Sequence, residues 1–150
     1  MRALRLIPLI TFASLAAIAL PAQKIDSLMI KLPFPKERAA EAVVHAFTTV
    51  GLGVSNTTSW LIEADQGATP NNLVGGQARR VVRAVLLPSD SSTVVIITGI
   101  EERSDQHGTS WQRLRIDNHA GGNGGKVWEK MVGAALLLDS TAVPAAARTR

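Results

Sequence analysis

Arginines and one tryptophan recur at alternating positions in two segments of the chain, and they form its most suggestive chemical pattern. Arg79 and Arg83 lie four residues apart in one segment, and Trp111, Arg113 and Arg115 alternate in another. Guanidinium groups beside an aromatic ring suit carboxylate, phosphate or sugar-phosphate groups. The pattern predicts a surface that binds a partner, although a solvated outer sheet face is the simpler interpretation.

A second set of large side chains predicts an alternative site. These residues are expected to lie between the helices and the sheet, and they are Phe47, Trp60, Trp128 and Met131. Apolar and aromatic side chains of this kind line pockets for small ligands. The alternative function is therefore a carrier of a small apolar ligand, such as a lipid.

Reactive groups do not gather along the sequence. The chain has no cysteine and no Gly-x-Ser-x-Gly turn. Glu101 and Glu102 are adjacent in an expected strand, where neighbours point to opposite faces, and His45, His107 and His119 are expected to lie apart. We predict no catalytic residue, no cofactor and no metal, with a hydrolase acting outside the cytoplasm as a third, weaker alternative.

A glycine-rich segment at residues 120–125 precedes Lys126 and invites comparison with a phosphate-binding loop. The Walker spacing requires glycine where Ala120 stands and serine or threonine where Val127 stands. The segment is therefore expected to be a flexible connector that leads into a helix. Free backbone donors at such a helix start could hold a small anion.

The first 22 residues are typical of a secretory signal peptide. Arg2 and Arg5 precede an uncharged apolar run at residues 6–20, and small residues follow it up to Ala22. We expect residues 1–22 to be removed and the protein to be exported, to the periplasm or the medium. Membrane contact is expected only if the segment stays uncleaved.

Charge disfavours one class of partner. Of the 16 Lys and Arg residues, Arg2 and Arg5 lie in the signal, which leaves 14 against 12 acidic residues. The folded body is therefore close to neutral, and nucleic-acid binding through bulk charge is disfavoured.

The elements that position these residues are expected in the order β-α-β-β-β-β-α. Period-2 and period-3.6 patterns of apolar residues set their bounds: strands at 27–32, 54–64 (or only 60–64), 78–87, 93–101 and 109–118, and helices at 36–50 and 126–139. The polar connection 66–76 is expected to be a mobile loop. The predicted fold class is two-layer α+β, an antiparallel sheet with two helices packed on one face. The single domain spans residues 23–140, and residues 141–150 are expected to form a disordered tail.

This order resembles the helix-grip domains of bacterial outer-membrane assembly lipoproteins. The shared pattern is a helix, the turn Gly51-Leu52-Gly53-Val54, and then a strand at 60–65 with a following glycine. The chain lacks the lipid-bearing cysteine of those proteins, and no functional residue is carried over from the resemblance.

Together these features predict an exported, non-catalytic module of the cell envelope. It is expected to bind a partner protein, or an anionic envelope polymer or lipid, through an open sheet face. The residues expected to bind are Arg79, Arg83, Trp111, Arg113 and Arg115. The oligomeric state stays open at this point.

Overall fold

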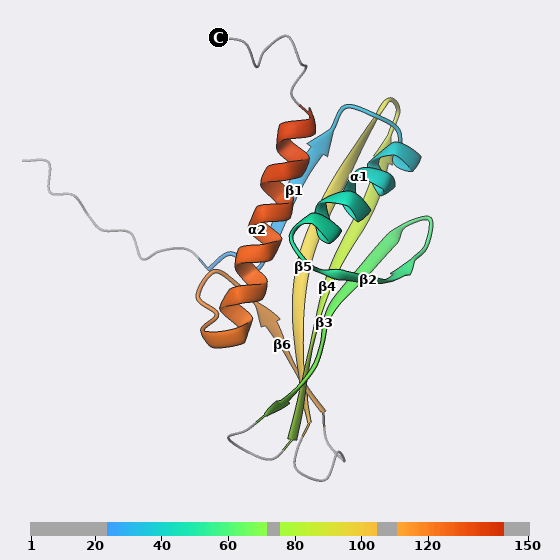
Figure 1. Cartoon of the computed structure of the whole chain (residues 1–150). Helices are drawn as coiled ribbons and strands as arrows, with labels where there is room; N and C mark the ends of the chain where they lie inside the picture. The colour runs from blue at the N-terminus through green and yellow to red at the C-terminus, as the bar shows by residue number, and fades with distance from the viewer. Residues whose placement is uncertain (1–23, 72–75, 105–110, 143–150) are drawn as a thin grey trace, which may run out of the picture.

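Two helices lie across one face of a six-stranded antiparallel sheet (Figure 1). The computed structural model describes residues 24–71, 76–104 and 111–142. The elements are β1 (Ser27–Leu32), α1 (Lys36–Thr49), β2 (Gly53–Thr57), β3 (Leu61–Asn71), β4 (Gly76–Ser89), β5 (Ser92–Ser104), β6 (Trp111–Ile116) and α2 (Gly122–Ala142). The predicted α+β class, with both helices on the same face of an antiparallel sheet, is confirmed.

Some boundaries differ from the prediction. The strand expected over 54–64 is two strands, β2 and β3, separated by a turn in which the Thr58 N–H donates to the Leu61 carbonyl at 2.8 Å. β3 continues to Asn71, so most of the loop expected at 66–76 is strand, because backbone pairing with β4 extends there past a bulge between Asp65 and Ala68. α2 begins inside the glycine-rich segment, at Gly122. The expected signal at 1–22 and residues 143–150 of the expected tail lie outside the described residues, whereas residues 141–142 of that tail are the end of α2.

The strand order is β1-β5-β4-β3-β2, and β6 also pairs with β5. β1 begins opposite Thr98 and β6 ends opposite Gly99, so these two strands lie end to end along one edge of β5. At their junction the Ile25 N–H donates to Asn118 Oδ1 at 2.8 Å, and the Asn118 N–H donates to the Ile25 carbonyl at 2.9 Å. The sheet therefore joins the start of the described chain to the approach to α2.

The core lies between the sheet and the two helices. Alternate residues of the central strands are fully or almost fully buried against it, and they include Val82, Ala84, Leu86, Val95 and Ile97. The helices contribute Val43 and Phe47 from α1, and Val127, Met131 and Leu138 from α2. The other residues of the same strands consequently point to the face that carries no helix, here called the open face.

Helix α2 approaches β5 closely at Gly99. A Cβ atom at this position would lie 2.7 Å from Met131 Sδ and 3.0 Å from Ile116 Cβ. Since glycine has no Cβ atom, it avoids these clashes and allows α2 to pack directly against β5. Within the described ranges, neither α1 nor α2 combines the length and the apolar composition that crossing a bilayer requires.

Candidate functional site

The open face carries the five side chains that the sequence singled out for partner binding. Arg79 and Arg83 project from β4, and Trp111, Arg113 and Arg115 project from β6, on the side of the sheet opposite the helices. Trp111 is 53% exposed. Strand register therefore brings together residues from segments about 30 positions apart in the chain.

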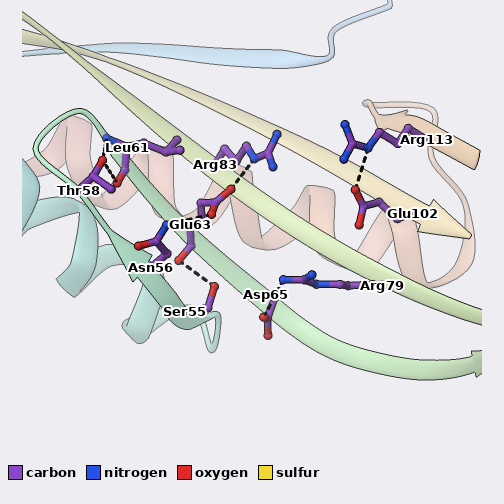
Figure 2. A network of polar contacts seen from close by, with 10 residues as sticks. All are labelled: Ser55, Asn56, Thr58, Leu61, Glu63, Asp65, Arg79, Arg83, Glu102 and Arg113. Atoms are coloured by element: carbon purple, nitrogen blue, oxygen red, sulfur yellow. Dashed lines mark hydrogen bonds and ion pairs between the residues drawn. The ribbon is translucent and has the colours of Figure 1, made fainter. Parts of the chain in front are cut away.

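Each of these four arginines contacts a carboxylate group. The pairs are Arg83 Nε–Glu63 Oε1 at 2.7 Å, Arg113 Nε–Glu102 Oε1 at 2.8 Å, Arg115 Nη1–Asp26 Oδ2 at 2.6 Å and Arg79 Nη2–Asp65 Oδ2 at 3.8 Å; Figure 2 shows three of them. The carboxylates neutralise the arginines, so this region is an array of ion pairs and not a purely cationic surface. We call these eight residues the ion-pair array.

Two carboxylates of the array have altered acidity. The Arg83 guanidinium, with help from the Asn56 amide, lowers the pKa of Glu63 below its ordinary value. The hydrogen bond from Arg115 lowers the pKa of Asp26 in the same way. Both groups stay ionised at neutral pH, because a lowered pKa keeps a carboxyl deprotonated over a wider range.

Apolar side chains occupy the other half of the open face. Cross-strand pairing aligns Leu61, Val85, Ile96 and Met29 in one row across four strands. A second row, toward the β4–β5 turn, contains Leu87 and Val94, and it ends at the charged Lys31 of β1, opposite Val94. Met29 is 72% exposed and Leu87 is 46% exposed. The six apolar residues are here called the apolar rows, and no described element covers them.

The helix-covered face has a charged cluster of its own, which the sequence patterns did not predict. Arg80 Nε lies 3.2 Å from Glu101 Oε2, and each of these side chains is only 7% exposed. Arg103 contacts the other carboxylate oxygen of Glu101. Arg80 lies between Ala78 and Val82 at an inward position of β4. A charged residue at an inward position is the sequence feature that could have predicted a buried ion pair.

The first turn of α2 lies against this cluster. A Cβ atom at Gly124 would be 3.4 Å from Glu101 Oε2, an ordinary van der Waals distance, so this turn of the helix is in contact with the carboxylate. A cleft of about 320 Å³ adjoins the cluster, and its lining includes Glu101, Arg103, Asp117 and His119. The hydrogen bond from Lys24, followed by the one from the His119 N–H, lowers the pKa of Asp117. The cleft thus contains both charge signs, and its carboxylates have cationic neighbours in the same chain.

The four residues of the alternative ligand pocket do not share one environment. Phe47 and Met131 are fully buried in the core, and Trp128 is partly buried against it. Trp60 is 55% exposed in the β2–β3 turn, where Lys36 Nζ lies 4.4 Å from the centre of its ring. A groove of about 480 Å³ lies apart from these four residues. Side chains of α1 and β2 line it: Ala40, Glu41, Val44, His45, Thr48 and Thr57.

Among the residues that the structure describes, no group of three histidine, cysteine, aspartate or glutamate side chains is placed to bind a metal ion. His107, one of the histidines considered for such a site, lies outside the described residues. Comparison with known proteins finds no protein-family model and no curated protein that matches the chain.

Proposed function

We propose that the chain is an exported, non-catalytic binding module of the cell envelope, whose open face docks a partner protein. The observation that carries this proposal is the apolar rows on a sheet face without helices. Burial of such rows against another protein would remove aliphatic surface from water, which is the main favourable contribution in protein association. Contiguous apolar patches of this kind mark interaction sites. The export part of the proposal rests on the signal pattern of residues 1–22.

The ion-pair array favours a protein over an anionic polymer or lipid surface. A polyanion would have to compete with Glu63, Asp65, Glu102 and Asp26 for the arginines. A protein surface that carries both charge signs can add contacts to these pairs without breaking them. Protein interfaces commonly combine an apolar core with a polar and charged rim, and the open face offers both.

Site-specific photocrosslinking in the producing cell tests the proposal. A photoreactive amino acid replaces Met29 in the apolar rows, and in a matched variant it replaces Leu136, which is 65% exposed on the outer side of α2. We expect a discrete protein adduct from position 29 only, in the envelope fraction. An added Ile96→Lys substitution is expected to abolish that adduct, because it places a charge in the middle of the apolar rows.

The expected signal is a difference between two exposed positions on opposite sides of the molecule. Equal adducts from positions 29 and 136, or an adduct at position 29 that survives Ile96→Lys in a folded variant, would show that the open face is not the docking surface. Recovery of the protein only from the cytoplasm would contradict export.

A further inference from the structure

We infer that the partner docked on the open face is a second copy of this chain, related to the first by a two-fold axis that runs between β4 and β5. This inference rests on the proposed docking role of the face and names its occupant. The two sheets would pack face to face, with the helices of each copy on the outside. Symmetric dimers of this kind need a surface that is complementary to itself.

The strand register shows that the apolar residues meet this requirement. An axis that is parallel to the strands and midway between β4 and β5 places β4 of one copy over β5 of the second copy. Each β4 residue then lies over the β5 residue that is its partner in the strand register. Val85 pairs with Ile96 in the register, and Leu87 pairs with Val94. In the dimer, these aliphatic side chains therefore face aliphatic side chains. Val81 and Ile100 also pair, but Val81 is only 5% exposed, so this pair adds little to the apolar match.

The charged residues follow the same rule. Arg79 is the register partner of Glu102, so the axis places each arginine over a glutamate of the second copy. Arg83 is the partner of Thr98, so its guanidinium faces a hydroxyl and not another cation. Opposite charges across an interface favour association, whereas like charges oppose it. The ion-pair array thus permits the same packing that the apolar rows drive.

The size of the face also fits a dimer. The sheet is five strands wide where β1 and β2 flank it and four strands wide beyond Asp65, beside β6, which is about 19–24 Å at about 4.8 Å per strand. The outward residues from Arg79 to Leu87 of β4 span about 26 Å at about 3.3 Å per residue. The resulting footprint of about 550 Å² per copy is close to the lower limit of standard interfaces, about 600 Å² per partner. Sheets that pack face to face keep their strand directions within about 30° of each other, and the charge match at Arg79 requires a crossing angle near zero.

Cysteine crosslinking tests the position of the axis. The chain has no cysteine of its own, so a single substitution gives an unambiguous reaction. Thr98→Cys on β5 lies beside the axis, and treatment of the whole protein with a short bismaleimide is expected to yield a covalent dimer. Leu136→Cys, exposed on α2, is the matched control and is expected to stay monomeric. Equal yields from the two variants would overturn the inference.

A charge exchange tests the pairing itself. Arg79→Glu and Glu102→Arg are each expected to weaken dimerisation about 10-fold, because each places like charges in opposition. An equimolar mixture of the two variants is expected to recover the wild-type affinity in sedimentation equilibrium, since only the mixed dimer pairs opposite charges at both places. Failure of the mixture to exceed the separate variants contradicts this axis.

The molecular mass of the wild-type protein in solution tests this inference independently of the proposed function. A concentration-dependent dimer that Ile96→Lys weakens at least about 100-fold supports the inference, because two lysines then enter an apolar interface. A wild-type protein that stays monomeric at all concentrations overturns it. If Met29 still crosslinks to a different protein in the cell, the docking function stands while the second copy is excluded as the occupant.

Discussion

The two faces of the sheet use the same pair of residue types in opposite ways, and two adjacent residues of β5 show the difference. Glu101 points to the helices and pairs with Arg80, and both side chains are 7% exposed. Glu102 points to the open face and pairs with Arg113, whose side chain is 70% exposed. The chemistry of the two pairs is identical, and only their surroundings differ.

Burial decides what each pair contributes. A buried ion pair loses its hydration, so removal of one partner leaves the other charged in a poorly solvated environment. An exposed pair gains little, because water solvates the separated charges almost as well. The covered face therefore depends on its pair for folding, while the open face keeps pairs that can add or exchange contacts with a partner at small cost.

The largest expected effect comes from neutralising the buried glutamate. Glu101→Gln is expected to lower the free energy of unfolding by about 3–5 kcal/mol, because Arg80 and Arg103 both contact this carboxylate. Glu102→Gln, one residue away and on the other face, is expected to cost less than about 1 kcal/mol. Urea denaturation at neutral pH measures both values.

If the two variants lose equal stability, burial does not distinguish the ion pair of Glu101 from that of Glu102. A double variant gives a second test of the covered face. Arg80→Met combined with Glu101→Leu is expected to recover most of the lost stability, because apolar side chains of similar size can replace a buried pair. If it does not recover, contacts of Arg80 other than the one to Glu101 dominate.

A second prediction concerns how tightly each face is packed. Gly99→Ala is expected to cost about 1–3 kcal/mol, because its Cβ would lie 2.7 Å from Met131 Sδ on the covered face. Thr98→Val, which keeps a β-branched side chain on the open face, is expected to change stability by less than about 0.5 kcal/mol. Thermal unfolding compares them. A stabilising Gly99→Ala would mean that α2 does not seat on β5 as described.

Local sequence patterns predicted the fold class and the sharing of one face by the arginines. Alternation within β4 and β6 is enough to separate Arg79 and Arg83, or Arg113 and Arg115, from the inward residues. Periodicity likewise predicted both helices to within a few residues at most ends. These features depend on neighbours within about ten positions, which a pattern search can see.

The partners of those arginines could not be predicted in this way. That Arg83 lies against Glu63, or Arg80 against Glu101, depends on the register between strands. The register is set by turns and by the bulge between Asp65 and Ala68, and no alternation pattern encodes the bulge. Alternation alone therefore presents the arginines as available cations, whereas the structure places a carboxylate beside each of them.

The smallest expected effect is the pH dependence of one open-face pair. Arg83 holds the pKa of Glu63 below its ordinary value of 4.5, so the folded state binds this proton more weakly than the unfolded state. The pair therefore contributes its full stability above about pH 5, and the contribution is lost as the pH falls through the lowered folded pKa. Since the pair is partly exposed, we expect a contribution of about 0.5 kcal/mol.

Glu63→Gln is expected to flatten the acid side of the stability profile by that amount, measured as the unfolding free energy between about pH 6 and pH 3. Arg83→Gln is the matched variant, because it removes the cause of the lowered pKa and leaves the carboxyl in place. If the pair acts as a unit, the unfolding free energy should fall by the same amount in both variants as the pH is lowered. An unchanged slope in Arg83→Gln would assign the lowered pKa to Asn56, the second donor to Glu63, and would leave the Arg83 side chain free to serve a partner without any cost to the fold.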